Sequence, residues 1–453
     1  MRVTKRFGLI GHPLGHSLSP YIHGRIMEEA GIRGTYTLYD MDEAELKNAM
    51  PLLLSDLDGL NCTIPYKGVV IPFLDRLDET SRSCGSVNTI YEKTGYNTDR
   101  YGFLGAAPSL FRKRVLLLGA GGVSRMMAFE AAVQDAEITI CARNEEKRDM
   151  LIRELSVRTK STAIGYSHPS DVEGLDFDVI LNGTPVGMWP VSGAMPTSPR
   201  VFRAGQDVFD TIYNPAATKW LMCGKRYGAS GKNGLSMLLM QAVHAQMIWN
   251  PGADICPDKM SGILPELSRR LLSLFPVKYI VTGFMGAGKS VLAKNLGDRL
   301  GIPSLDLDRE IVGKRGCSIP EIFRRDGEES FRKMEESVLE EMLNRPGSAC
   351  IAVGGGAVIQ EDIQALIQKY QALTVYIEVS FSAIWRRVGP AGGRPLLGDV
   401  SGGEDERFRR AAALYEARLP VYESTCDAKV NGERSEAEVT EEAFHSLGYG
   451  GSQ

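Results

Sequence analysis

A segment of eight residues, Gly283 to Ser290, constrains the fold of this chain more than any other feature. It reads G-F-M-G-A-G-K-S and matches the pattern G-x-x-x-x-G-K-S in full. The apolar run Tyr279 to Thr282 precedes it and predicts a buried β-strand, and a helical pattern follows it. Glycines let backbone N–H groups turn toward phosphate oxygens, and a helix N-terminus favours anions. The sequence therefore predicts a strand–loop–helix phosphate site within an α/β fold.

Four polar side chains in and after this loop predict nucleotide chemistry. Lys289 is expected to reach the β- and γ-phosphates, and Ser290 is expected to ligate Mg²⁺. About sixteen residues beyond the lysine, Asp306 and Asp308 alternate in a segment that we expect to be a strand. Because alternate residues of a strand share one face, both carboxylates are predicted to point into one site. One would hold Mg²⁺ through water while the other contacts an acceptor hydroxyl.

A second glycine loop, Gly119 to Gly122, follows the apolar run Val115 to Leu118. A helical stretch over 123–133 and a strand over 137–141 are expected next, which together predict a dinucleotide-binding βαβ unit. Ser124 stands where the G-x-G-x-x-G pattern has its third glycine, and a small serine is tolerable there. The residue that follows the second strand region is Arg143 rather than an acidic residue, which favours NADP over NAD.

Length and composition limit the remaining possibilities. The 453 residues suggest two to four domains, and short apolar runs alternate with amphipathic stretches, as in βαβ architecture. The net charge of −4 has no basic excess that would indicate a nucleic-acid partner. No apolar run is long enough to span a bilayer. The eight cysteines are scattered singly without zinc spacing, which favours a cytoplasmic protein.

The C-terminal region, from about residue 277 to 445, resembles the shikimate kinases. The resemblance rests on six motifs in order: the Gly283 to Ser290 loop, Asp306-x-Asp308, Phe331-Arg332-x-x-Glu335, Gly354-Gly355-Gly356, Arg394-Pro395-Leu396-Leu397 and Arg418-x-Pro420-x-Tyr422. It implies an ATP site that comprises Gly283, Gly286, Ala287, Gly288, Lys289, Ser290, Val291 and Arg394, with Arg394 on a lid. It also implies that shikimate is held by Asp308, Arg332, Gly354, Gly355, Gly356 and Arg418. Lys289, Asp308 and Arg394 would be catalytic, with Ser290 and Asp306 on the magnesium side.

The N-terminal region, from about residue 5 to 265, resembles the shikimate dehydrogenases. The motifs are the segments 11–20, 61–67, 85–89, 97–99, 182–188, 213–215 and 234–241. The resemblance implies that shikimate contacts Ser17, Ser19, Thr63, Lys67, Asn88, Asp99, Tyr213 and Gln241. It implies NADP contacts at Gly119, Ala120, Gly121, Gly122, Val123, Arg143 and Gly234. Lys67 and Asp99 would form the acid–base pair. Arg100 departs from this family, which often has glycine there, and Ala142 stands where asparagine is usual.

Both resemblances together imply a bifunctional enzyme with NADP(H), ATP and Mg²⁺ as cofactors. The first activity would reduce 3-dehydroshikimate to shikimate, and the second would phosphorylate the 3-hydroxyl of shikimate. The expected organisation is a dehydrogenase over 1–275, with a substrate lobe (1–104 and 235–275) and an NADP lobe (105–234), and a P-loop kinase over 276–453. The alternatives are a quinate/shikimate dehydrogenase fused to the kinase, or a chain in which one site is inert and regulatory. The expected partners are small-molecule substrates, with neither nucleic acid nor membrane.

Overall fold

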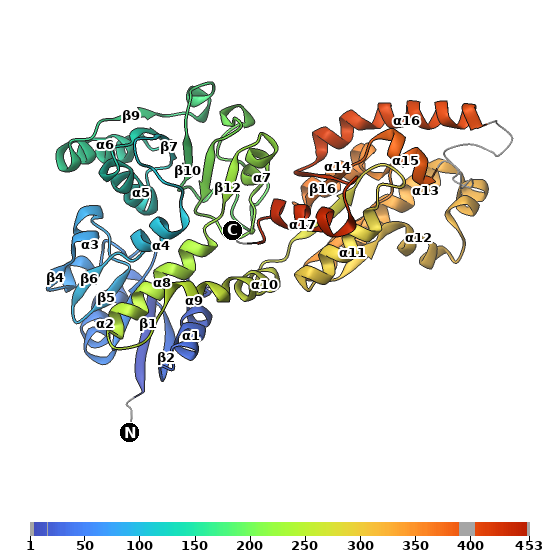
Figure 1. Cartoon of the computed structure of the whole chain (residues 1–453). Coiled ribbons are helices and arrows are strands. Elements are labelled where there is room, and N and C mark those ends of the chain that lie inside the picture. The colour runs from blue at the N-terminus through green and yellow to red at the C-terminus, as the bar shows by residue number, and fades with distance from the viewer. Residues whose placement is uncertain (1–3, 16, 389–403, 451–453) are drawn as a thin grey trace.

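The computed structural model describes residues 4–15, 17–388 and 404–450, which form helices and three largely parallel β-sheets. The α/β class expected from the sequence is confirmed. Two of the sheets lie in one half of the molecule and the third lies in the other half (Figure 1). Throughout the described ranges, every helix is too short or too polar to cross a bilayer.

The first sheet has the strand order β2-β1-β3-β5-β6-β4. Its strands are β1 (Lys5–Gly11), β2 (Gly34–Asp40), β3 (Gly59–Cys62), β4 (Arg76–Leu77), β5 (Thr89–Tyr91) and β6 (Thr94–Tyr96). Its helices are α1 (Ser19–Glu29), α2 (Glu43–Asp56), α3 (Glu79–Cys84) and α4 (Asp99–Ala106). Strands β1, β2 and β3 are parallel, and β5 runs antiparallel to β3. The loops after β1 and β3 and the start of β5 therefore meet at one edge of the sheet.

The second sheet has the order β12-β11-β10-β7-β8-β9, and all its pairs are parallel. Its strands are β7 (Arg114–Leu118), β8 (Glu137–Cys141), β9 (Ala163–Tyr166), β10 (Val179–Asn182), β11 (Asp207–Asp210) and β12 (Ser230–Lys232). Its helices are α5 (Gly122–Val133), α6 (Glu145–Thr159) and α7 (Lys219–Arg226). The predicted unit of strand, glycine loop, helix and strand is present in β7, α5 and β8, within one residue of the expected bounds.

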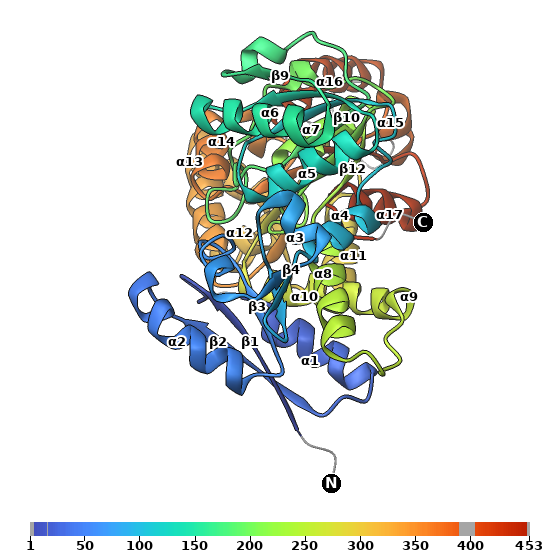
Figure 2. The same cartoon turned by 90° about the vertical axis from the view of Figure 1, so that its left-hand side faces the viewer.

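Three helices after the second sheet return to the first: α8 (Leu235–Trp249), α9 (Pro257–Met260) and α10 (Leu264–Leu274). Both views show α8 between the two sheets (Figure 1 and Figure 2). Leu239 and Val243 of α8 share a buried core with Ile22 and Ile26 of α1. The Trp249 ring at the end of α8 stacks on Phe7 of β1, with 4.9 Å between the ring centroids.

The third sheet has the order β14-β15-β13-β16-β17, and all its pairs are parallel. Its strands are β13 (Lys278–Thr282), β14 (Ser304–Asp306), β15 (Ala349–Ala352), β16 (Leu373–Glu378) and β17 (Ala428–Asn431). Its helices are α11 (Lys289–Leu300), α12 (Leu307–Arg315), α13 (Ile319–Asn344), α14 (Glu361–Lys369), α15 (Phe381–Val388), α16 (Glu404–Thr425) and α17 (Glu436–Ser446). Single 3₁₀ turns occur at Ile71–Phe73, Pro169–Val172, Pro199–Val201, Ser261–Ile263 and Ala357–Ile359.

Helices α4 and α8 cross where Gly102 lies against the backbone of α8. A Cβ atom at Gly102 would lie 2.5 Å from the carbonyl oxygen of Met237 and 3.2 Å from the backbone nitrogen of Gln241. Real side chains do not reach such distances from backbone atoms, so only glycine permits this crossing. The crossing places Asp99, at the start of α4, close to the helix that follows the second sheet.

Asp210, fully buried at the carboxyl end of β11, joins the loops that leave the second sheet. Its carboxyl group accepts hydrogen bonds from Asn182 Nδ2 at 2.9 Å, Ile212 N at 3.1 Å and Thr218 Oγ1 at 2.7 Å. Burial raises the pKa of Asp210 to about 7, although these three donors favour the ionised form. The carboxyl group thus holds together the end of β10, the loop after β11 and the N-cap of α7.

We predict that Gly102→Ala destabilises the protein by about 2 kcal/mol, because the added methyl group forces α4 away from α8. Gly105→Ala is the matched control. It lies on the same helix, is exposed and has open space around its Cβ position. At position 105, alanine should stabilise α4 by up to about 1 kcal/mol, because alanine has a higher helix propensity than glycine. Thermal unfolding of both variants tests this, and equal melting temperatures would contradict it.

We also predict that Asp210→Asn gives a stability difference that depends on pH. The folded state holds the Asp210 proton more tightly than the unfolded state, so this stabilisation is complete below about pH 4 and is lost as the pH rises through about 7. The asparagine variant, which stays neutral, should therefore gain in melting temperature relative to the parent between pH 5 and pH 8. Asp207→Asn, at the more accessible opposite end of β11, is the control. If the melting-temperature difference between Asp210→Asn and the parent did not grow with pH, the raised pKa of Asp210 would be refuted.

Candidate active sites

Lys67 and Asp99 form an ion pair at the edge where the functional loops of the first sheet meet. Lys67 Nζ donates to Asp99 Oδ2 at 2.5 Å, and their side chains are 24% and 14% exposed. Asn88 Nδ2 donates to Asp99 Oδ1 at 2.9 Å. Three residues that were predicted from separate motifs are thus brought together, and a carboxylate, an amide and an amine share one partly open position.

The charge of Lys67 is set by two opposing effects. Burial lowers the pKa of the amine, but the charge of Asp99 and its hydrogen bond outweigh burial, so the pKa lies above its ordinary value. The amine is therefore a protonated donor at neutral pH. A proton at Nζ is available to a substrate oxygen, and Asp99 stabilises the cation that holds it.

The other residues predicted for this site come from the loops after β1, β3 and β11 and from helices α1 and α8. Ser17 lies in the loop between β1 and α1, and Ser19 is the first residue of α1; Ser17 Oγ accepts from Ser19 N at 3.3 Å. Thr63 follows β3, and its methyl group lies against Gly11 at the end of β1. Tyr213, from the loop after β11, packs on the core cluster that contains Leu18. Gln241 lies on α8, one helical turn from Met237 at the α4 crossing.

The glycine loop Gly119 to Gly122 lies between β7 and α5, as predicted. Gly119 has a positive φ of 99°, and α5 begins at Gly122 with its free N–H groups toward the loop. Ser124 is fully buried and donates to the carbonyl oxygen of Gly183 at 3.3 Å. The serine at the third glycine position therefore fits, and it links α5 to the loop after β10.

The remaining predicted cofactor residues border the same edge of the second sheet. Arg143, after β8, is exposed. Gly234 is buried, and a Cβ atom there would lie 2.1 Å from the carbonyl oxygen of Thr211. The loop therefore provides free backbone N–H groups for a diphosphate, and Arg143 provides a nearby cation at the end of β8.

The loop Gly283 to Ser290 joins β13 to α11 and forms a cradle. Gly286 and Gly288 have positive φ angles of 80° and 98°. Lys289 Nζ donates to the carbonyl oxygen of Phe284 at 3.1 Å, so the amine lies over the loop. These features fit a nucleotide phosphate chain, with Lys289 as its cation. Arg394 lies outside the described residues.

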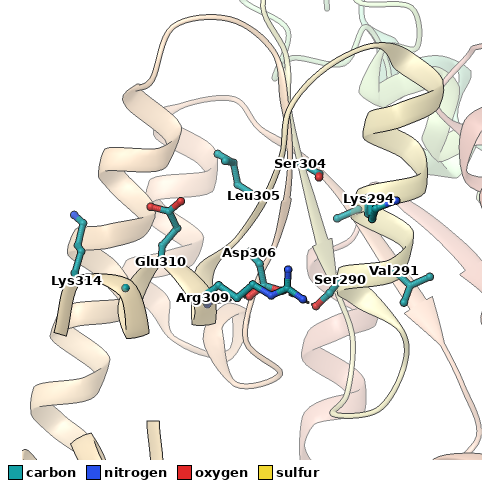
Figure 3. A pocket seen from close by; sticks show the side chains of 11 residues that line it. Ser290, Val291, Lys294, Ser304, Leu305, Asp306, Arg309, Glu310 and Lys314 are labelled. Atoms are coloured by element: carbon teal, nitrogen blue, oxygen red, sulfur yellow. Dashed lines mark hydrogen bonds between the residues drawn. The ribbon is translucent and has the colours of Figure 1, made fainter. Parts of the chain in front are cut away.

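Ser290 and Asp306 face each other on one side of this loop (Figure 3). Ser290 Oγ donates to Asp306 Oδ2 at 2.6 Å, and a cavity of about 490 Å³ opens beside them, lined also by Lys294 and Arg309. A hydroxyl and a carboxylate within one coordination sphere fit Mg²⁺, which takes oxygen ligands and keeps several waters.

The prediction that Asp306 and Asp308 share one face of a strand is wrong. Strand β14 ends at Asp306, and Asp308 lies in the first turn of α12. Asp306 Oδ1 accepts from Arg309 N at 3.1 Å and so caps the helix, which ends the strand there. The two carboxylates consequently diverge: Asp306 lies beside Ser290, and Asp308 lies beside Gly354.

Arg332 and Arg418 come from different helices and converge on Gly356. A Cβ atom at Gly356 would lie 3.0 Å from Arg332 Nη2 and 3.1 Å from Arg418 Nη2. Arg418 is only 7% exposed, and its Nη1 donates to the carbonyl oxygen of Gly355 at 3.0 Å. Two guanidinium groups that lie close together can bind a carboxylate with paired hydrogen bonds.

Two further residues complete this site and were not assigned a role from the sequence. Glu335 is 1% exposed, pairs with Arg332 Nη1 at 2.5 Å and accepts from Gln360 Nε2 at 2.9 Å. Tyr422 is fully buried and donates its hydroxyl to the carbonyl oxygen of Gly355. Both belong to motifs that were recognised for their arginines, so the signal was the i+3 and i+4 spacing from Arg332 and Arg418.

Arg100, which departs from the expected glycine, lies in the first turn of α4 and forms an ion pair with Glu130 of α5. The Glu130 side chain is 8% exposed, so this pair joins the two lobes directly behind Asp99. Burial lowers the pKa of Arg100, but Glu130 outweighs it and the net pKa is raised.

Comparisons with known protein families agree with both enzymatic parts of the chain. Residues 9–90 match the model of the shikimate dehydrogenase substrate binding domain, and residues 285–447 match the model of shikimate kinase. A shikimate dehydrogenase (NADP(+)) of Methanococcus maripaludis is 37% identical over 257 residues, which cover 54% of this chain and 91% of that relative.

Solved structures extend the comparison to the fold. A crystal structure of a shikimate dehydrogenase in complex with NADP⁺ is 32% identical, with a TM-score of 0.54, and the match covers 58% of this chain and 96% of that one. A shikimate 5-dehydrogenase of Listeria monocytogenes, solved with shikimate and NAD, is 26% identical with a TM-score of 0.54 and covers 58% and 98%. The chain belongs to the shikimate dehydrogenase family, and it carries a shikimate kinase domain after its dehydrogenase part.

Proposed function

We propose that the chain catalyses two successive reactions, the NADPH-dependent reduction of 3-dehydroshikimate to shikimate and the ATP-dependent phosphorylation of the shikimate 3-hydroxyl. The observation that supports the proposal is the presence of two separate sets of reactive groups among the described residues. Lys67 and Asp99 lie 2.5 Å apart in one site, and Lys289, Asp308 and two converging arginines surround the other. The product of the first reaction is the acceptor of the second.

In the first site, the chain's own residues handle the proton. The Gly119 to Gly122 loop and Arg143 would hold NADPH, which would supply the hydride for the C3 carbonyl carbon. Lys67 Nζ donates a proton to the carbonyl oxygen as that oxygen gains charge, so the C=O bond becomes an alcohol. Asp99 holds Lys67 in place and keeps it protonated before the step, and Asn88 holds Asp99.

In the second site, binding and charge stabilisation dominate. Arg332 and Arg418 would hold the carboxylate of shikimate, while Asp308 accepts the proton from its 3-hydroxyl. Lys289 would neutralise charge on the transferring phosphoryl group of ATP. Ser290 and Asp306 would hold Mg²⁺, which screens the phosphate charge when it is bound. Arg394 would add a cation from the lid.

We further propose the division into a dehydrogenase over 1–275 and a kinase over 276–453. The substrate lobe would comprise 1–104 and 235–275, and the NADP lobe 105–234. The chain would work in the cytoplasm on small molecules, and its eight free cysteines support a reducing compartment.

We expect Lys67→Ala to abolish only the reduction and Lys289→Ala to abolish only the phosphorylation, each by at least about a hundredfold. The full chain is supplied with 3-dehydroshikimate, NADPH and ATP–Mg²⁺, and the loss of NADPH and the formation of ADP are followed. For Lys67→Ala, added shikimate should restore ADP formation. Lys333→Ala, an exposed lysine on α13 that pairs with Glu329, is a matched control that should keep both activities.

Three outcomes would contradict parts of this proposal. If Lys67→Ala formed no ADP even with added shikimate, if Lys289→Ala lost the reduction, or if either substitution left both activities intact, the assignment of two sites would be wrong. Faster turnover with quinate and NAD⁺ than with shikimate and NADP⁺ would indicate a quinate/shikimate dehydrogenase. A parent chain with only one measurable activity would indicate that the other site is inert and regulatory.

A further inference from the structure

Helix α7 of the dehydrogenase part packs on the kinase part through one stripe of side chains. Lys219, Met222 and Arg226 are spaced i, i+3 and i+7, so they lie on one face of the helix. Met222 belongs, with Ala216 and Ala217, to the same buried cluster as Tyr376 and Tyr422 of the kinase. Figure 1 shows α7 beside α17, at the boundary between the two halves.

Two cations of this stripe bind the segment that joins α16 to β17. Arg226 Nη2 donates to the carbonyl oxygen of Glu423 at 2.8 Å, and Arg226 Nη1 donates to that of Cys426. Lys219 Nζ lies 3.4 Å from Asp427 Oδ1, and the Asp427 side chain is only 14% exposed. Asp427 Oδ2 in turn accepts from Thr374 N at 2.7 Å, at the start of β16.

Arg226 therefore supplies a hydrogen-bond donor and a positive charge to the C-terminus of α16. The last carbonyl groups of a helix have no partner within it, and a cation there also interacts favourably with the helix dipole. Helix α16 ends at Thr425, so the carbonyl of Glu423 is one of these groups. A residue of the dehydrogenase part thus caps a helix of the kinase part.

The capped end of α16 carries the groups that shape the kinase site. Tyr422, next to Glu423, and Arg418, one turn earlier, both donate to the carbonyl oxygen of Gly355. Arg418 then reaches Gly356, where it meets Arg332. A shift of the α16 terminus would move these groups relative to the Gly354 to Gly356 loop.

We propose that Arg226 and Lys219 are positioning residues for the kinase reaction, which complete its shikimate site from the dehydrogenase part. This proposal rests on the proposed kinase function. The residues act through Arg418 and Tyr422 and do not touch substrate. Their contribution falls on the binding of the shikimate carboxylate rather than on ATP, because Arg418 and Tyr422 at the end of α16 donate to Gly355 and not to the backbone of the Gly283 to Ser290 loop.

The test uses the full chain and measures ADP formation with shikimate and ATP varied separately. Arg226→Ala should raise the KM for shikimate about fivefold, the equivalent of about 1 kcal/mol for a lost cap, with the KM for ATP unchanged. Arg226→Lys, which keeps the charge, should recover part of the loss. Reduction of 3-dehydroshikimate by NADPH should stay unchanged in both variants, which verifies that the chain is folded.

Lys225→Ala is the matched control. Lys225 lies next to Arg226 and donates to the carbonyl oxygen of His445 at 2.6 Å, at the end of α17, which carries none of the predicted shikimate contacts. It should leave the KM for shikimate unchanged. Because Lys219→Ala removes the lysine cation from the Asp427 carboxylate, Lys219→Arg is measured beside it and should retain the parental KM.

Several results would overturn the proposal. An unchanged KM for shikimate in Arg226→Ala, or an equal rise in Lys225→Ala, would do so. A fall in kcat with both KM values unchanged would indicate a smaller folded fraction instead of positioning. Absence of shikimate-dependent ADP formation in the parent chain would refute the proposed kinase function itself. Failure of the positioning proposal would appear only in the variants, so the two failures can be told apart.

Discussion

The parallel arrangement of strands decides where this protein places its chemistry. Strands that run in the same direction are joined by helices, so the loops at their carboxyl ends gather at one edge of each sheet. Lys67 follows β3, Gly119 follows β7 and Gly283 follows β13, one in each sheet. The same edge of the third sheet also receives Gly354 after β15. In each sheet, loops that follow parallel strands therefore carry the predicted functional residues.

Buried carboxyl groups then hold these edges in register. Asp99 binds Lys67 and Asn88, Asp210 joins three backbone segments, and Glu335 joins Arg332 to Gln360. A carboxyl group that is removed from water is costly unless donors surround it. Each of these groups has donors from at least two segments, so each fixes the separation of elements that are far apart in the sequence.

The two enzymatic parts share packed surface. Leu272 of α10 and Met222 of α7 lie in the same buried cluster as Tyr279 and Ile280 of β13. Ser348 Oγ donates to the carbonyl oxygen of Leu272 at 2.8 Å, which is a second contact between the kinase part and the dehydrogenase part. Contact of this kind resembles a domain core more than a flexible linker, and it explains how a helix of one part can cap a helix of the other.

Much of this architecture was readable from the sequence because its signals are local. Strand–loop–helix units at β7–α5 and β13–α11 follow from periodicity and from glycines that permit the turns, and the resemblance to the shikimate dehydrogenases singled out Lys67 and Asp99. The strand expected through Asp308 failed because a single side-chain cap at Asp306 starts a helix. Other features could be seen only in the tertiary structure: the hydrogen bond of Ser124 to Gly183, the burial of Glu335, and the hydrogen bonds of Arg226 at the C-terminus of α16. Each pairs residues that are distant in the chain, and only the packing of sheets and helices decides which distant groups meet.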